Sequence, residues 1–339
     1  MNERDSSPTR TVAILGTRYQ DFEIEEHVLA DTGARIVSGA GATTEEIVAL
    51  AGSADVIIAG SGPRFDAATI AQLTCSGIVR SGVGVETVDL DAARDAGMWV
   101  ARVADYGTES VAQHTVALAL AAVRRLVTAD RNLRAGTWGV GPLRPLHLPS
   151  ELRAGIVGFG RIGRRTAELL GAVGFGLAAH DPAAPVDAPG VTDLSLDELL
   201  TTCDLVTLHA PPPADGSFLL GATELATMKA GSVLVNTSRG SLIDQAALVA
   251  ALGTGRPGTA ALDVFAREPL DPSIFDGVAD RVILTPHMAW YTEESERDLR
   301  EKAAAEAKRL LDGERLNCSA RSGSAWPRTT RWRRSTRRA

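Results

Sequence analysis

Aromatic side chains are scarce in this sequence, where Phe, Trp and Tyr together make up 4% of 339 residues. Small aliphatic side chains must therefore fill any hydrophobic core. The hydrophobic content of 45% is enough for two such cores, and the 33 glycines allow helices to pack closely on a sheet. A chain of this length is expected to form two domains rather than one.

Cysteine is also rare. Cys75, Cys203 and Cys318 lie far apart and match neither a disulfide framework nor the spacing of metal ligands. We expect free thiols in a reducing cytoplasm and no metal site.

Long hydrophobic runs are missing. The longest spans residues 116–123, ends at Arg124-Arg125, and is far too short to cross a bilayer. The first ten residues, MNERDSSPTR, do not resemble a signal peptide. The sequence therefore predicts a cytoplasmic protein without a membrane partner.

The formal net charge is −7, but it is unevenly distributed. The residues after Cys318 hold seven arginines and no acid, so the first 318 residues have a net charge of −14. An acidic body argues against nucleic acid as the main partner of the folded part. The segment 319–339 is expected to be a disordered basic tail. Its arginines can bind anions, but a cloning or frameshift artefact explains the abrupt composition equally well, and we assign it no function.

A glycine-rich turn between two apolar runs is the most informative feature of the chain. It follows the apolar residues 155–157 and comprises Gly158, Phe159, Gly160, Arg161, Ile162 and Gly163. A helix-compatible segment, a second apolar run (173–179) and Asp181 come next. The first glycine allows the tight turn, the second allows backbone to approach a pyrophosphate, and the third allows the helix to pack on the strand. An acid at Asp181 binds the ribose hydroxyls and repels a 2′-phosphate, so the pattern predicts a site for NAD rather than NADP.

Apolar runs alternate with helical patterns along the whole chain, which predicts an α/β fold with parallel sheets. The predicted strands are 11–16, 34–37, 55–59 and 77–80 in the first half, and 155–157, 177–180, 205–208, 232–236, 260–264 and 282–284 in the second. One long helix is predicted over 108–136, and another over 292–312. We expect a substrate domain of residues 1–105 plus 291–318 and a cofactor domain of residues 106–290. The active site is expected in the cleft between them.

Three chemically useful side chains follow predicted strands of the cofactor domain, where ligands bind in open α/β sheets. Arg239 is permanently charged and fork-shaped, so it can hold a carboxylate and polarise the adjacent carbonyl. His287 titrates near neutrality and can donate or accept a proton during hydride transfer. Glu268 can bond the second imidazole nitrogen, which fixes the tautomer and raises the pKa of the histidine.

These motifs resemble the D-isomer-specific 2-hydroxyacid dehydrogenase family over about residues 11–317. The matching segments are RSGVGVETVDLDAA (80–93), VADYGTESVAQHTVALAL (103–120), VGFGRIG (157–163), VNTSRGSLID (235–244), ALDVFAREPL (261–270) and TPH (285–287). The resemblance implies two similar α/β domains and a catalytic trio of Arg239, Glu268 and His287. It also implies further site residues: backbone N–H groups of Ser81, Gly82 and Val83 for the substrate carboxylate, Asp263 for the nicotinamide carboxamide, and Thr237 and Ala210 lining the cofactor cleft.

Residues 287–291 (HMAWY) resemble the branch of the family that contains the carboxyl-terminal-binding corepressors. This implies that Trp290 contacts the substrate side chain and can select an apolar or thioether-bearing acid; a tryptophan that only packs between the domains is an equal alternative. Glu86-Thr87 departs from the Asp-Asn that many members have there, so the geometry of the substrate loop can differ.

The expected function is NAD-dependent interconversion of a 2-keto acid and a D-2-hydroxy acid. A homodimer formed through helix 108–134 is implied by the family, although burial of that helix within one chain is an alternative. An NAD(H)-sensing protein with vestigial catalysis is the rival from another class, and the presence of both Glu268 and His287 argues against it. Oxidation of phosphite on the same scaffold stays open, whereas Glu268 argues against formate, because formate enzymes of the family have glutamine there.

Overall fold

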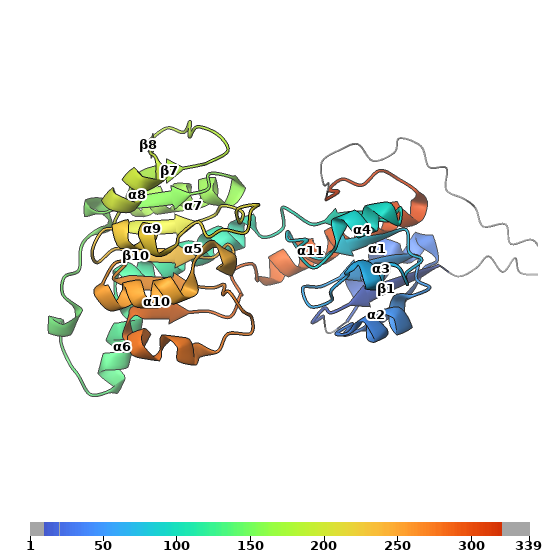
Figure 1. Cartoon of the computed structure of the whole chain (residues 1–339), viewed down its shortest axis with the longest axis horizontal. Coiled ribbons are helices and arrows are strands. Elements are labelled where there is room, and N and C mark those ends of the chain that lie inside the picture. Colours follow the sequence, from blue (N-terminus) through green and yellow to red (C-terminus); the bar gives the residue numbers. More distant parts are fainter. Residues whose placement is uncertain (1–9, 20, 321–339) are drawn as a thin grey trace, which may run out of the picture. The chain divides into compact units, whose positions relative to one another are not determined.

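The computed structural model describes residues 10–19 and 21–320. The chain divides into two compact units, one made of the described residues up to Tyr106 and from Thr292 onward, the other of Gly107–Tyr291. In Figure 1 the blue and red ends of the sequence accordingly share one unit.

The first unit is built on a five-stranded parallel sheet in the order β2-β1-β3-β4-β5. Its strands are β1 (Thr11–Leu15), β2 (Arg35–Gly39), β3 (Val56–Ala59), β4 (Gly77–Arg80) and β5 (Trp99–Arg102). Four of them were predicted. The fifth, WVAR at the edge of the sheet, was missed although it is as apolar as β4 (GIVR). The strand order reverses between β1 and β3, which makes their carboxyl ends a place where a ligand can bind.

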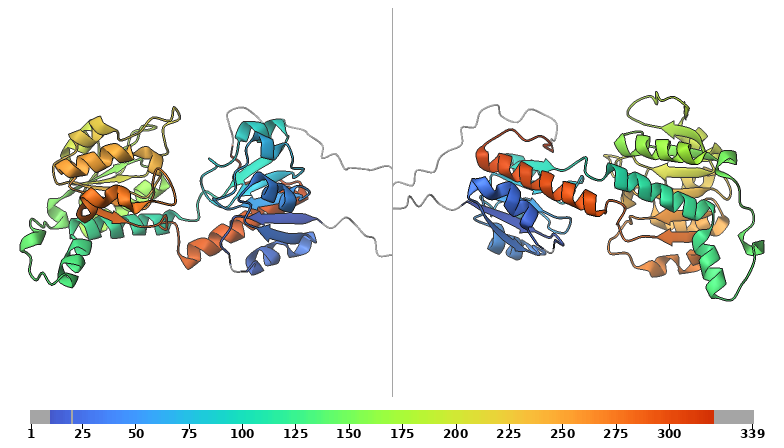
Figure 2. Two further views of the ribbon diagram at one scale, coloured as in Figure 1. Left: turned by 60° about the horizontal axis from the view of Figure 1, so that its bottom comes forward. Right: turned by 180° about the vertical axis from the view of Figure 1, so that it is seen from behind.

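Helices cover both faces of this sheet. They are α1 (Glu23–Leu29), α2 (Thr44–Ala51), α3 (Ala67–Ile70), α4 (Leu90–Asp95) and α11 (Glu293–Asp312). Ile47, Ile70 and Ala93, from the second to fourth of these, form one core with sheet residues such as Ile57 and Ile78. The predicted helix near the C-terminus is α11, which packs against α1, β3 and β4 (Figure 2). Its N-terminus is capped by Thr292, whose side chain accepts a hydrogen bond from the amide of Ser295.

The chain after α11 returns to the edge of the same sheet. The Arg102 amide donates to the carbonyl of Cys318 (3.0 Å), and the Ala320 amide donates to that of Val100 (2.8 Å). Ser319 therefore forms an antiparallel bridge with β5. The prediction that disorder begins at residue 319 is wrong for residues 319 and 320, because β5 offers them unpaired backbone groups. The rest of the predicted tail lies outside the described residues.

The second unit has a seven-stranded parallel sheet in the order β12-β11-β10-β9-β6-β7-β8. The strands are β6 (Arg153–Val157), β7 (Gly176–His180), β8 (Val191–Asp193), β9 (Leu205–Leu208), β10 (Val233–Asn236), β11 (Thr259–Leu262) and β12 (Val282–Leu284). All six predicted strands are present. The seventh, β8, is a short and largely exposed edge strand without an apolar run. The strand order reverses between β6 and β9, as in dinucleotide-binding sheets.

Two layers of helices cover the second sheet. One face is packed by α5 (Thr108–Val123) and α7 (Arg161–Val173). The other is packed by α8 (Leu196–Thr202), α9 (Ala222–Thr227), α10 (Gln245–Thr254) and the short helical segment η5 (Pro272–Arg281). The apolar residues of both strand faces are therefore buried, which explains the nearly continuous apolar runs in the sequence.

The prediction of a single helix over 108–136 is wrong in one respect, because the structure has two helices there. It consists of α5 and α6 (Leu126–Arg134), which Arg125 separates with a left-handed backbone (φ 49°). Arginine is a good helix former, so local propensity favours continuation. The helix nevertheless ends before Arg125. Residues of α5 are buried against the sheet, whereas no residue of α6 is buried.

No helix within the described residues combines the length and the apolar character needed to cross a bilayer.

Candidate active site

The glycine turn joins β6 to α7 at the point where the strand order reverses. Gly158 has φ 90°, and a side chain on it would lie 2.4 Å from the amide nitrogen of Ala210. A side chain on Gly163 would lie 2.0 Å from the carbonyl oxygen of Gly158. Gly160, by contrast, has no neighbouring atom within 4 Å of such a side chain, so its backbone stays approachable. Each glycine thus has the environment that a pyrophosphate-binding turn requires.

Asp181 follows β7, and its side chain is hydrogen-bonded to this turn. Its carboxylate accepts hydrogen bonds from the amides of Phe159 (2.6 Å) and Ala183 (2.8 Å). Burial acts to raise the pKa of Asp181, but these backbone hydrogen bonds outweigh it and hold the pKa below its ordinary value. A permanent negative charge beside the turn suits ribose hydroxyls and disfavours a 2′-phosphate. The residues present therefore fit NAD.

The loops after β9 and β10 lie next to the turn. Ala210 is buried, and its carbonyl accepts a hydrogen bond from Ser238 Oγ (2.9 Å). Thr237 is also buried, and its hydroxyl is bonded to that of Thr115 on α5 (2.7 Å). Both loops are fixed by side-chain hydrogen bonds that no sequence pattern predicted.

Arg239 stands in the turn after β10. Asn236 Nδ2 donates to its carbonyl oxygen (2.9 Å), and its own guanidinium donates to the carbonyl of Ser238 (2.9 Å). The next residue must be glycine, since a side chain on Gly240 would lie 2.0 Å from the carbonyl of Phe265. This close approach holds the arginine loop against the loop after β11.

Glu268 and His287 form a hydrogen-bonded pair after β11 and β12. The distance between Glu268 Oε2 and His287 Nδ1 is 2.7 Å, and the other carboxylate oxygen accepts from the amide of Phe265 (3.0 Å). With Nδ1 engaged, Nε2 is left for a substrate. Both side chains are partly exposed, at 37% and 45%.

The pKa of His287 is raised and that of Glu268 is lowered. The hydrogen bond to Glu268 raises the pKa of His287, against burial, which lowers it. Burial raises the pKa of Glu268, but the hydrogen bond from His287 and the charge of Arg239 leave that pKa lowered overall. Such a carboxylate–imidazole pair can hold a proton on the histidine near neutral pH.

Asp263 lies beneath the histidine loop and is fully buried. Its carboxylate accepts from Thr285 Oγ1 (2.5 Å), from the Met288 amide (2.9 Å) and from the Ala289 amide (2.8 Å). His287 has a left-handed backbone (φ 52°), and the Asp263 carbonyl accepts from its amide (2.8 Å). The family resemblance implies that Asp263 binds the nicotinamide carboxamide. In this structure its side chain is hydrogen-bonded to the loop that holds His287.

Sequence reasoning missed one further residue of this support. His114 Nε2 on α5 lies 3.2 Å from Thr285 Oγ1 and 3.7 Å from the Asp263 carboxylate. The only signal was that His114 belongs to the 103–120 segment that matches the family.

The predicted carboxylate loop follows β4 in the first unit. The Ser81 amide donates to the carbonyl of Ala59 (2.9 Å), and the Gly82 amide donates to that of Arg80 (2.9 Å). Among the described residues no acceptor is found for the amide of Val83, whose side chain is 37% exposed. Of the three amides predicted to bind the substrate, two therefore already have acceptors.

Trp290 follows the histidine loop and is half-buried. Its ring lies edge-on to that of Tyr291, with centroids 5.6 Å apart.

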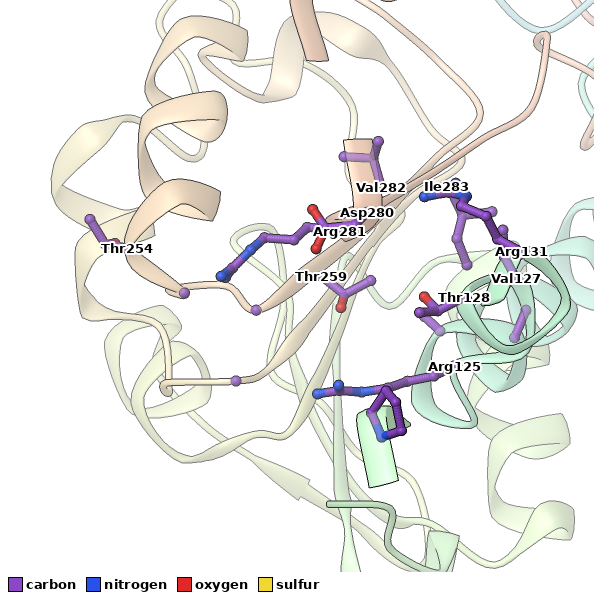
Figure 3. A pocket seen from close by; sticks show the side chains of 16 residues that line it. Arg125, Val127, Thr128, Arg131, Thr254, Thr259, Asp280, Arg281, Val282 and Ile283 are labelled. Carbon is purple, nitrogen blue, oxygen red and sulfur yellow. The ribbon is translucent and has the colours of Figure 1, made fainter. Parts of the chain in front are cut away.

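A separate cavity of about 460 Å³ opens at the amino ends of β11 and β12, the edge of the sheet opposite to Arg239, Glu268 and His287. Figure 3 shows three arginines around it: Arg131 of α6, Arg281 of η5, and Arg125 between α5 and α6. Arg131 and Arg281 already donate to the carbonyls of Ala279 (3.2 Å) and Leu252 (3.0 Å). This cavity is not the candidate active site. Within the described residues, no cluster of His, Cys, Asp or Glu is placed to hold a metal ion.

A parallel sheet with a dinucleotide turn, an arginine and an imidazole–carboxylate pair on three adjacent strand ends is typical of one class of protein, the nicotinamide-dependent oxidoreductases. Residues 116–289 match the family model of the D-isomer specific 2-hydroxyacid dehydrogenase, NAD binding domain. The chain belongs to this family, as the motifs indicated.

Relatives include the D-3-phosphoglycerate dehydrogenase of Mycobacterium tuberculosis, 35% identical over 81% of this chain and 52% of that protein. The glyoxylate reductase of Aeropyrum pernix is 36% identical over 74% of this chain and 78% of that protein. The chain thus spans about half the length of the phosphoglycerate dehydrogenases it matches.

Among solved structures, the TT0316 protein from Thermus thermophilus is 31% identical, with a TM-score of 0.83 over 91% of this chain and 99% of that chain. The D-lactate dehydrogenase from Aquifex aeolicus, complexed with NAD and lactic acid, is 26% identical, with a TM-score of 0.79 over 89% and 96%. The predicted α/β class with two parallel sheets is confirmed.

Proposed function

We propose that this protein is an NAD-dependent dehydrogenase that interconverts a 2-keto acid and a D-2-hydroxy acid. The single observation on which the proposal rests is the 2.7 Å hydrogen bond between Glu268 and His287 on adjacent strand ends of an NAD-binding unit. Family membership and the names of the relatives support it.

In the proposed reaction, bound NADH supplies a hydride to the carbonyl carbon of the keto acid. His287 donates the proton from Nε2 to the carbonyl oxygen, while Glu268 stabilises the protonated imidazole from the Nδ1 side. The Arg239 guanidinium binds the substrate and polarises the carbonyl. Asp263 keeps the histidine loop in its left-handed conformation, and the loop at Ser81–Val83 binds the carboxylate.

An NAD(H) sensor without catalysis is less well supported, because a sensor needs no proton donor. A phosphite-oxidising enzyme is not favoured by any contact found in the structure. Asp181 supports NAD over NADP. The free thiols of Cys75, Cys203 and Cys318 support a reducing, cytoplasmic location.

A homodimer is part of the proposal. Large hydrophobic side chains are exposed on α6 and in the segment after it: Leu126, Leu133, Trp138, Val140 and Leu148, with Trp138 at 88%. Exposed apolar groups concentrated in one segment of the chain are typical of an interface.

NADH oxidation by the full chain tests this function. The substrates are pyruvate, glyoxylate, hydroxypyruvate, 2-ketobutyrate, phenylpyruvate and 4-methylthio-2-ketobutyrate, with NADPH in parallel. We expect turnover with NADH, its loss by about 10²-fold or more in His287→Ala, and a fall in kcat/KM in Arg239→Ala. His27→Ala, which changes an exposed histidine of α1 outside the site, serves as the control. Turnover that survives His287→Ala would contradict the proposed role of His287, and no turnover with NADH bound would favour the sensor.

A further inference from the structure

A tyrosine that the sequence analysis did not single out lies at the carboxyl end of the first sheet. Tyr19 belongs to the loop after β1, and Ser81 follows β4. The strand order of this sheet reverses between β1 and β3, so this edge is where an open α/β sheet binds ligands. Both side chains are half-buried.

The two hydroxyl groups are hydrogen-bonded to each other. Tyr19 Oη and Ser81 Oγ are 2.7 Å apart, and either can be the donor. Two hydroxyls have two hydrogens, and their mutual bond uses one of them. Whichever group donates, one O–H of the pair remains to donate to a third atom.

The tyrosine ring is held by a buried ion pair. The Arg300 guanidinium of α11 lies over the ring, 4.5 Å from its centroid. Glu25, which is 1% exposed, accepts from Arg300 Nε (2.9 Å) and Nη2 (2.8 Å). Burial raises the pKa of Tyr19 to about 12, so the phenol keeps its proton at physiological pH. The pair is therefore a fixed donor rather than a mobile surface group.

The neighbouring loop has few amides left to donate. Those of Ser81 and Gly82 already have the carbonyls of Ala59 and Arg80 as acceptors, which leaves the amide of Val83. A carboxylate has two oxygens and about four lone-pair positions, so one amide satisfies only part of it.

We propose that the Tyr19–Ser81 hydroxyl pair is a recognition element for the substrate carboxylate, donating the hydrogen bond that complements the Val83 amide. The inference rests on the proposed function, in which this loop binds the carboxylate of the keto acid. Arg300 and Glu25 act through Tyr19 as positioning residues.

Tyr19→Phe tests this with little structural change, since the ring beneath Arg300 stays. We expect the KM for pyruvate to rise about tenfold or more, as for loss of a hydrogen bond to a charged group. The KM for NADH should stay unchanged, and kcat should stay within about twofold, because uniform binding is what is lost. Ser81→Ala should shift KM in the same direction. Ser76→Ala, at the opposite end of the same strand, is the matched control and should leave KM unchanged.

Comparing substrates identifies the group that is recognised. A carboxylate contact predicts the same fold-change in KM for pyruvate, glyoxylate and hydroxypyruvate. A change confined to hydroxypyruvate would overturn the proposal, since the pair would then contact its 3-hydroxyl. A Tyr19→Phe enzyme with wild-type KM for all three would also overturn it and leave the proposed function intact.

Calorimetric titration of the protein–NADH complex with oxamate, a carboxylate analogue of pyruvate, needs no turnover. Weaker binding to Tyr19→Phe than to wild type supports the recognition role even if the panel shows no activity. Equal binding to both, or no oxamate binding by wild type, rejects it.

Discussion

His287 is the residue whose ionisation should control the rate of the proposed reaction. Reduction of a keto acid needs the protonated imidazole, so kcat/KM for reduction should fall as pH rises through the pKa of His287. The hydrogen bond to Glu268 raises this pKa above its ordinary value of about 6.5. In Glu268→Gln the negative charge is gone, and we expect the midpoint of the pH profile to move to lower pH.

The measurement is kcat/KM for reduction between about pH 5 and 9. Glu151→Gln, an exposed carboxylate outside the site, is the control and should follow wild type. Oxidation of the hydroxy acid needs neutral His287, so its rate should rise with pH over the same range. Superimposable profiles for wild type and Glu268→Gln would show that the carboxylate does not set the pKa.

At this scale the sequence predicted the positions of the three proposed catalytic residues better than the contacts that support them. Arg239, Glu268 and His287 each follow an apolar run, so their meeting at one sheet edge could be inferred from parallel-strand topology. The bond of His114 to Thr285 joins residues 171 positions apart. The contact of Tyr19 with Ser81 likewise depends on side-chain packing that no local pattern encodes.

Among the elements, the packing of α11 against α1 is stabilised by one buried ion pair, between Arg300 and Glu25. Arg300 and Glu25 are 8% and 1% exposed at their side chains. Removing the arginine leaves a buried carboxylate without its charged partner, which costs about 3–5 kcal/mol. We therefore expect Arg300→Met to lower the urea midpoint of unfolding strongly.

Lys308→Met on the same helix is the matched control. Lys308 pairs with Asp31, whose side chain is 70% exposed, and such a surface pair contributes about 0–1 kcal/mol. The double change Glu25→Gln with Arg300→Met should recover part of the loss. Equal midpoints for Arg300→Met and Lys308→Met would contradict the importance of the buried pair.

The elements found from sequence and those missed differ in a physical way. Central strands such as β3 and β10 are buried on both faces, and their apolar runs identify them. The edge strand β8 and the break at Arg125 depend on what lies beside them rather than on their own residues.

For the whole molecule, the proposed dimer gives a direct expectation. Light scattering at micromolar concentration should give twice the mass of one chain. The exposed apolar surface of Leu133 and Trp138 is expected to drive association. Replacing both residues by serine removes this surface and should shift the protein towards the monomer. The matched control is replacement of Phe218 and Ile274, exposed apolar residues elsewhere in the same unit. A monomeric wild type would refute the dimer.

In the sequence, the second unit lies between the two parts of the first unit. This arrangement affects which unit can fold first while the chain is being synthesised. All strands of the second unit have emerged before α11 is made, so that unit can fold while the first is incomplete. Leu299, Ala303, Ala307 and Leu310 of α11 are buried in the first unit. Until they arrive, one face of β3 and β4 lacks its cover. The N-terminal part of this protein, although synthesised first, is therefore expected to complete its folding last.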